Sequence, residues 1–216
     1  MKTITSHFFE FAPTREESSI PETLVRHLDL FSSIATESFY MVDVQQQRFC
    51  YIQPHTSFLC DYAAEEALNL GYDFYPKIVH PDDLPTWKKM HKAILRYLDD
   101  DAEKRDEVDY FSCTFRLQHK YSFLSHPLPQ MVYHRLKPVW VDDQLRYLIC
   151  SVAGTSTKEA LRMYNSDGKS YEEYNLQTHK WKPITIKPLT EHERVILMLE
   201  QQGKNVKEIS SFQILK

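Results

Sequence analysis

Three segments between residues 108 and 153 alternate apolar and polar side chains with a period of two. They run from Val108 to Gln118, from Met131 to Val141 and from Leu145 to Ala153. The connection Asp142-Asp143-Gln144 has the length of a tight hairpin turn, so the last two segments are predicted to pair as antiparallel neighbours. Pro138 cannot donate a backbone hydrogen bond, which favours an edge position or a bulge in the middle segment. The chain is therefore predicted to build an antiparallel sheet.

A β-hairpin and a long helix are predicted ahead of these strands. Residues 39–44 alternate in character, a polar turn follows, and residues 49–52 return as a second strand. In the sequence HPDDLP, which begins at His80, an aspartate is expected to cap a helix that holds Pro85 in its first turn and continues to about Leu98. This order favours an α+β fold with one five-stranded antiparallel sheet and helices on one face.

The pattern divides the chain into four parts. Residues 1–37 are predicted to form an arm and a helix, whose apolar stripe can pack on its own domain or on a second copy. Residues 38–157 would form the main domain. The turn sequence NSDG at Asn165 indicates a small β-hairpin linker over residues 158–188, and residues 189–216 are predicted to contain further helices.

The composition argues against several classes of protein. The 26 basic and 30 acidic residues give a formal charge of -4, which does not attract nucleic acid at long range. The sequence contains no apolar run of about 20 residues and begins without a secretion signal, so we expect a cytoplasmic protein with no membrane contact. The four cysteines form no CxxC pair, and buried free thiols are favoured over disulfides or a zinc site.

The middle of the chain resembles a PAS domain between Ser38 and Thr157. The resemblance is carried by FYMVDVQQQRFCYIQP, by DYAAEEALNLGYDFYPKIVHPDDL and by the three strands that follow. Members of that family sense small molecules, light, oxygen or redox state, and many of them dimerise. The resemblance implies a sensor that forms a homodimer, but a shared fold does not select the signal.

The same resemblance implies a ligand pocket between the sheet and the long helix. Its walls would come from inward side chains of both elements, and packing in the core is the competing explanation for each aromatic residue among them. The candidates are Tyr40 (or Met41), Phe58, Phe74, Trp87, Ile94, Phe115, Tyr133 and Ile149.

The sequence contains no flavin or haem signature, so no cofactor is assigned. Cys60 lies in SFLCDYAA, which lacks the neighbours found in the NCRFLQ motif of the flavin photosensors. His91 is the candidate haem ligand within the long helix, although a histidine on a helix flank is more often solvated or hydrogen-bonded than ligating. His80 is expected to brace the turn before that helix. The expected ligand is an unspecified apolar or aromatic small molecule, or there is none.

The C-terminal sequence LTEHERVILMLEQQGKNVKEIS resembles the beginning of a LuxR-type DNA-binding domain. Thr190 and Glu193 predict a capping box, and Gly203 is expected to end the first helix in the left-handed conformation. The sequence stops at SFQILK, so we expect a partial helix-turn-helix without the helix that reads DNA. No residue of this chain is therefore assigned to DNA binding, and DNA would be contacted only through the missing helix.

These observations predict a transcription regulator in which a sensing domain controls an incomplete LuxR-type domain. The alternative is a stand-alone module for protein interaction or dimerisation that does not bind DNA. An enzyme is not expected, because the sequence contains no G-x-S-x-G elbow, no glycine loop for phosphate and no HExxH motif.

Overall fold

The computed structural model describes residues 20, 22–54, 56–100, 106–120 and 128–213. The predicted N-terminal arm, the Pro21 position and the last residues of SFQILK lie outside this part of the chain. The chain divides into two compact units, Met1–Ile184 and Thr185–Lys216.

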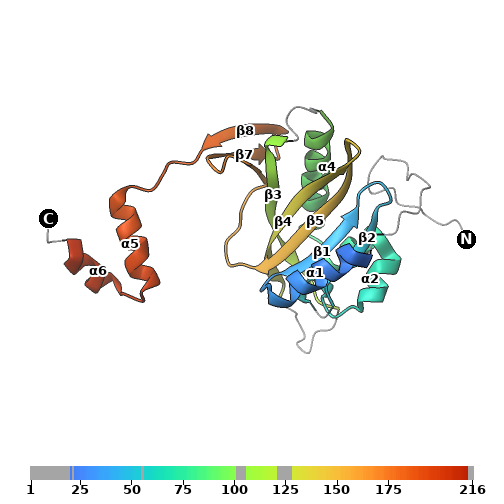
Figure 1. Ribbon diagram of the computed structural model, residues 1–216, viewed down its shortest axis with the longest axis horizontal. Helices are drawn as coiled ribbons and strands as arrows, with labels where there is room; N and C mark the ends of the chain where they lie inside the picture. Colours follow the sequence, from blue (N-terminus) through green and yellow to red (C-terminus); the bar gives the residue numbers. More distant parts are fainter. Residues whose placement is uncertain (1–19, 21, 55, 101–105, 121–127, 214–216) are drawn as a thin grey trace, which may run out of the picture. The chain divides into compact units, whose positions relative to one another are not determined.

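The first unit consists of eight strands with helices between and before them (Figure 1). Short 3-10 turns occur at Ser57–Leu59 and Gly71–Phe74. In chain order the helices and strands are α1 (Glu22–Ile34), β1 (Ser38–Asp43), β2 (Arg48–Ile52), α2 (Ala64–Leu70), α3 (Tyr75–Ile78), α4 (Leu84–Asp100), β3 (Val108–Leu117), β4 (Gln130–Val141), β5 (Gln144–Gly154), β6 (Arg162–Asn165), β7 (Ser170–Asn175) and β8 (Lys180–Thr185).

The strands form one eight-stranded sheet in the order β2-β1-β5-β4-β3-β6-β7-β8. The predicted neighbours β3, β4 and β5 do lie side by side, and each of the pairs from β2 to β7 is antiparallel. The prediction of a five-stranded PAS-like sheet, followed by a separate hairpin linker and a partial helix-turn-helix, was wrong. Strands β6, β7 and β8 extend the same sheet.

The extension follows from the free edge of β3. That strand pairs with β4 on one side, and its other edge leaves backbone groups that need partners. The chain after β5 is held against β3 because the backbone N–H of Glu159 donates to Thr114 Oγ1 over 2.7 Å, and the Thr114 hydroxyl donates to the Glu159 carbonyl over 3.0 Å. Strand β6 then pairs along this edge, with Met163 opposite Phe111.

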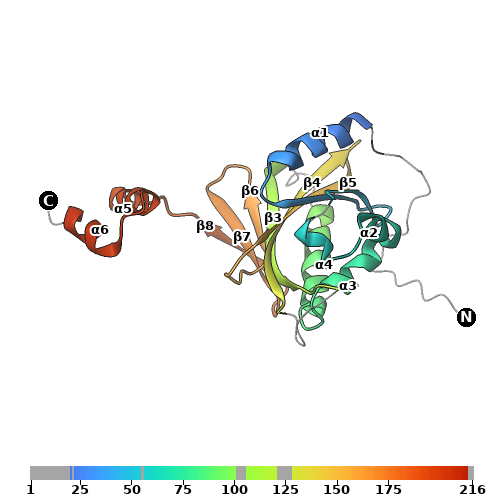
Figure 2. The ribbon, with the colours of Figure 1, turned by 90° about the horizontal axis from the view of Figure 1, so that it is seen from below.

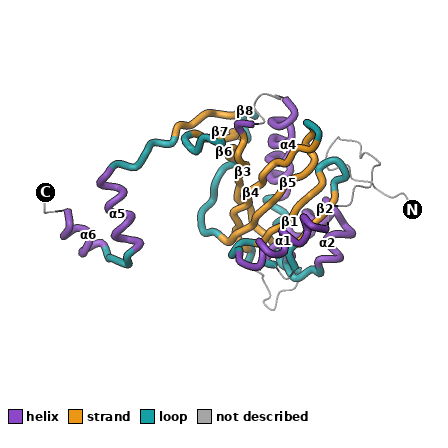
Figure 3. Tube along the Cα trace, in the orientation of Figure 1, coloured by secondary structure: helices purple, strands orange, loops and turns teal. Residues whose placement is uncertain are grey.

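Helices cover both faces of the sheet, as the views in Figures 2 and 3 show. Helix α4 lies on one face, which we call the inner face, together with α2 and α3. Helix α1 lies on the opposite, outer face. It is attached there by hydrogen bonds from Tyr51 of β2, whose hydroxyl donates to Asp29 over 2.9 Å and lies 3.1 Å from the hydroxyl of Ser32. The prediction of helices on one face was therefore also incomplete.

An ion pair joins the start of α4 to β3. The Asp83 carboxylate accepts hydrogen bonds from the backbone N–H of Arg116 at 2.8 Å and from its guanidinium at 2.6 and 3.0 Å. The aspartate therefore links the helix to the sheet through its side chain. His80 braces the preceding turn, because its Nδ1 accepts from the backbone N–H of Asp82 over 3.3 Å.

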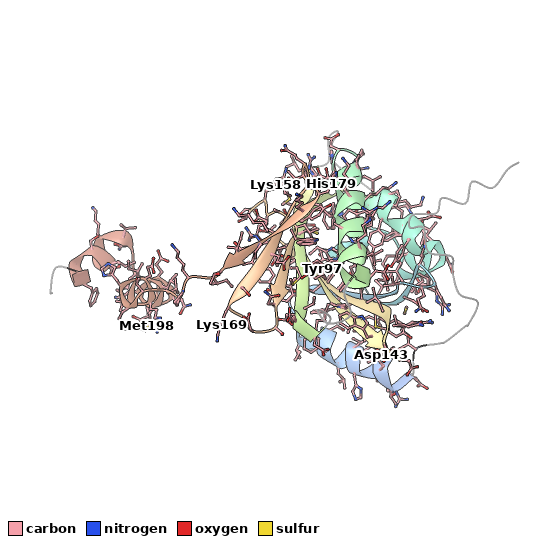
Figure 4. The ribbon with its side chains drawn as sticks, turned by 90° about the horizontal axis from the view of Figure 1, so that it is seen from above. Tyr97, Asp143, Lys158, Lys169, His179 and Met198 are labelled. Atoms are coloured by element: carbon pink, nitrogen blue, oxygen red, sulfur yellow. The ribbon has the colours of Figure 1, made fainter. Side chains whose placement is uncertain are left out.

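An aromatic cluster packs the added strands against α4. Tyr97, labelled in Figure 4, projects from α4, and its ring centroid is 5.0 Å from that of Trp181 on β8. Trp181 also lies 5.0 Å from Tyr174 and 6.0 Å from Phe111. Strands β3, β7 and β8 thus share one apolar core with the end of the long helix.

The second unit contains α5 (Glu191–Gln201) and α6 (Val206–Gln213). The predicted capping box is present at the start of α5, where Thr190 and Glu193 bond to each other's backbone N–H groups. Gly203 ends the helix with φ of +76°, as predicted. Leu199 and Ile209 are buried in this unit. None of the helices in the described ranges is long and apolar enough to cross a membrane.

Candidate functional site

Six of the candidate pocket residues meet on the inner face. Each of them is at most 2% exposed, and they come from β1, β3, α4 and the segment between β2 and α3. Phe58, for example, stacks on Tyr40 with 4.1 Å between ring centroids. The six are Tyr40, Phe58, Phe74, Trp87, Ile94 and Phe115.

The other two candidates, Tyr133 and Ile149, lie on the outer face. Tyr133 is adjacent to the inward His134 on β4, and consecutive residues of a strand point to opposite faces. Its ring is instead contacted by the guanidinium of Arg135, at 5.2 Å. Met41, the alternative to Tyr40, is buried, but the alternation places it on the outer face as well.

Polar groups are buried among the inner aromatic residues. The Tyr40 hydroxyl is 2.6 Å from His134 Nε2, and the Tyr75 hydroxyl donates to the Tyr40 oxygen over 3.3 Å. Tyr40 therefore accepts from Tyr75 and has its own proton to donate to His134. In a neutral imidazole this arrangement leaves the proton of His134 on Nδ1.

A second histidine approaches from α4. His91 is 6% exposed, and its Nδ1 is 3.1 Å from the carbonyl oxygen of Trp87. Because a carbonyl only accepts, Nδ1 carries the proton and Nε2 is left as an acceptor. The imidazole lies against the Trp87 ring, with 3.8 Å between centroids. Its position is fixed by this ring contact and by the hydrogen bond to the backbone.

The two imidazoles face each other without charge. Their centroids are 6.0 Å apart. Burial lowers the pKa of His91 to about 4, and burial, followed by repulsion from His91, lowers the pKa of His134 well below its usual range. Within the part of the chain that the structure describes, His91 Nε2, His134 Nδ1 and Trp87 Nε1 are buried without a hydrogen-bond partner. Buried polar atoms of this kind ordinarily have one.

A small cavity between α4 and the sheet is lined by Trp87 and His91 but not by His134. Its volume is about 10 Å³, which is close to the space that one water molecule requires. An unpaired acceptor on His91 and an unpaired donor on Trp87 occur in its walls. An occupant would therefore need to be neutral and able both to donate and to accept. The lining residues are Val42, Tyr72, Tyr75, Trp87, His91, Ile94, Leu95, Leu136, Leu148 and Cys150.

The buried thiols near the cavity are poor nucleophiles. Burial raises the pKa of Cys113 to about 12, and the pKa of Cys150 is raised further for the same reason. A thiol becomes reactive mainly as a thiolate, and these two remain protonated near neutral pH. All four cysteines are free. In the described ranges, no three His, Cys, Asp or Glu side chains are grouped as ligands for a metal ion.

The sequence contained a signal for His134 that the selection of candidates missed. Val132, His134 and Leu136 are all at most 1% exposed and belong to the inward set of β4. The two-residue period places the histidine in phase with these aliphatic neighbours. Tyr133, the predicted pocket residue, has the opposite phase and lies on the outer face. Tyr75, on a helix of four residues, has no comparable periodic signal.

No protein-family model and no curated protein matches this chain. The function proposed below is therefore argued from the geometry of the site.

Proposed function

We propose that the first unit is the signal-sensing part of a transcription regulator and that the segment after β8 belongs to its output region. The observation that carries the proposal is a buried pair of neutral imidazoles, one of which, His91, lines a cavity, with polar atoms that have no partner among the described residues. Such atoms favour an occupant that completes their hydrogen bonds, and a cavity of about 10 Å³ limits that occupant to about the size of a water molecule unless the surrounding side chains move. Binding in this cavity would change the contacts of α4 residues such as Trp87 and His91 and those of sheet residues such as Leu136.

The link to transcription rests on the sequence that begins at Leu189. Its capped helices carry the residues that resemble the start of a LuxR-type DNA-binding domain. A separate compact unit at this position suits an output region that a sensor controls. We also propose a cytoplasmic location, in keeping with four free thiols.

Transcript levels in the organism that encodes the chain test this proposal. Deletion of the gene should change a defined set of transcripts, and the variants His91→Phe and His134→Leu should shift the same set. No change on deletion would contradict a regulator. A change on deletion that neither histidine variant reproduces would contradict sensing through the inner cluster. Asp82→Ala, at a residue 74% exposed in its side chain, is the matched control.

A second candidate is a dimerisation module without DNA binding, and α1 favours it. Leu30, Phe31 and Ile34 are 68%, 56% and 81% exposed. Exposed apolar side chains gathered on one helix are typical of a protein interface. We propose that this side of α1 pairs with a second copy of the chain.

Sedimentation at several concentrations tests the dimer. Leu30→Glu and Ile34→Glu should convert a dimer to a monomer, because each would place a charge in an apolar interface. Arg26→Glu on the same helix, whose side chain is 74% exposed, is the control. A wild-type chain that stays monomeric contradicts the module, whereas a dimer without transcriptional effect favours it over the regulator.

A further inference from the structure

The outer face of the sheet contains a groove that the inner cluster does not use. Its volume is about 300 Å³, which is at the lower limit of small-molecule sites. Strands β1, β5, β4 and β3 form its floor. Apolar and aromatic side chains are combined in it with two cations and two hydroxyl groups. The lining residues are Phe39, Tyr110, Arg135, Lys137, Ile149, Cys150 and Ser151.

Arg135 is held by an ion pair with Glu37 and by a hydrogen bond to the Tyr133 side chain. Glu37 accepts from Nη1 alone, at 3.1 and 3.4 Å. Nε is buried and has no hydrogen-bond partner within the described ranges. The edge formed by Nε and Nη2 would bind a carboxylate through two parallel bonds once the guanidinium turns its buried Nε toward the groove. The side chain is 44% exposed, which leaves it room to turn toward the groove.

Neighbouring groups strengthen the case for an anion at Arg135. The guanidinium lies 5.2 Å from the ring centroid of Tyr133 and 5.9 Å from that of Tyr110. Apolar rings exclude water and thereby strengthen electrostatic attraction. Ser112, directly opposite Arg135 on β3, is fully buried, and its hydroxyl also lacks a partner among the described residues.

Lys137 provides a second positive charge in the groove. Its Nζ is 2.7 Å from Asp109, and both side chains are nearly half exposed, at 49% and 46%. Exposed ion pairs of this kind contribute little to stability. An incoming carboxylate can therefore replace Asp109 at low cost. Neither Glu37 nor Asp109 lines the groove, so its charged walls are both positive.

We propose that this groove binds a small organic anion. Its carboxylate would pair with Arg135 and Lys137, and its aromatic or aliphatic body would lie against Phe39, Tyr110 and Ile149. The site is independent of the signal proposed for the inner cluster.

Binding at this site would act on α1 through Glu37. This residue lies in the short connection between Ile34, where α1 ends, and Ser38, where β1 begins. A carboxylate that takes over the guanidinium competes with Glu37 and weakens the ion pair that ties this connection to β4. The competition predicts that removal of the Glu37 charge strengthens binding of the anion.

Calorimetric titration of the full chain with 2-naphthoate, and with neutral 2-naphthamide as the matched ligand, tests the site. The acid should bind and the amide should bind about tenfold more weakly or not at all, because a charge-assisted hydrogen bond is lost. Arg135→Gln should weaken naphthoate binding by about tenfold or more for the same reason. Glu37→Gln should strengthen it, and Arg162→Gln, which removes a cation outside the groove, should leave it unchanged.

Three results would overturn the proposal. Naphthoate and naphthamide could bind equally, which would identify a groove that takes apolar bodies without regard to charge. Arg135→Gln and Arg162→Gln could have equal effects, which would indicate general attraction of the anion to the surface. Sedimentation could show that the wild-type chain is a dimer and calorimetry that this dimer does not bind naphthoate. If the monomeric Ile34→Glu variant then binds naphthoate, the groove belongs to an interface between copies of the chain.

Discussion

The Tyr40 hydroxyl lies 2.6 Å from His134 Nε2, and this contact joins β1 to β4 across the intervening strand β5. Tyr40→Phe removes the hydroxyl and leaves a buried nitrogen without a partner. We expect the free energy of unfolding to fall by about 1–3 kcal/mol, the usual cost of an unsatisfied buried polar group. Urea denaturation monitored by circular dichroism measures the change.

Tyr75→Phe is the matched comparison. Its hydroxyl donates to Tyr40 over 3.3 Å, a longer bond whose loss leaves an oxygen that still bonds to His134. The loss of stability should be smaller than for Tyr40→Phe. Equal losses in the two variants would mean that the hydrogen bond to His134 contributes no more to the free energy of unfolding than the bond between the two tyrosines.

Acid should destabilise the first unit before most carboxylates titrate. An unfolded histidine has a pKa of about 6.5, whereas burial lowers the pKa of His91 to about 4. The unfolded chain therefore binds protons first as the pH falls. The stabilising contribution of neutral His91 is complete above about pH 6.5 and is lost between there and about pH 4, at up to about 1.4 kcal/mol per pH unit. His134, whose pKa burial also lowers, adds to the slope in the same direction.

Urea denaturation at a series of pH values between 7 and 5 measures this slope. His91→Leu and His134→Leu should each reduce it, because each removes one group that is neutral in the folded state. A wild-type stability that does not change over this interval would show that the imidazoles are accessible to protons in the folded protein.

Asp83 and Asp82 should differ sharply in their effect on stability. Asp83 accepts three hydrogen bonds from Arg116 and is 22% exposed in its side chain, whereas Asp82 is 74% exposed and lies 3.5 Å from the same guanidinium. Asp83→Ala should cost about 2 kcal/mol through lost charge-assisted bonds. Asp82→Ala should cost less than about 0.5 kcal/mol, as for most surface changes. Thermal denaturation of the two variants would contradict this if the melting temperatures fell equally.

Hydrogen exchange should show β6 to be part of the sheet. Its residues, Arg162–Asn165, pair with β3 and with β7, so their ladder amides should be protected to a similar degree as those of β4. A flexible linker would exchange much faster. Trp181→Ala provides a second measurement, since loss of its ring contacts with Tyr97 and Phe111 should destabilise the first unit as a whole.

The sequence was informative where hydrophobic period and local chemistry coincide. The strands β3 to β5, the helix from Leu84 and the capping box at Thr190 were all located from such patterns, and the structure places them at those positions. Six of the eight candidate pocket residues also come together on one face. Periodicity fixes the face on which a residue lies once the phase is read correctly.

The extension of the sheet depends on contacts that no local pattern contains. Residues 158–188 look like a short polar hairpin, and only the pairing of Met163 with Phe111, fifty-odd positions earlier in the chain, places it on the edge of β3. The link between Thr114 and Glu159 is likewise visible only in three dimensions. The position of α1 on the outer face depends on Tyr51, which gives no sign in the sequence of its two partners on that helix.

Strand β4 has two different chemical environments on its two faces, the buried inner cluster and the charged outer groove. His134 belongs to the neutral interior and the next residue, Arg135, to the charged exterior, while Cys150 of the adjoining strand borders both hollows. His134 and Arg135 share one stretch of backbone, so a substitution that moves this backbone affects the packing on both faces of the sheet. Double substitutions at positions 134 and 135 should therefore depart from the sum of the single effects, even though their side chains never meet.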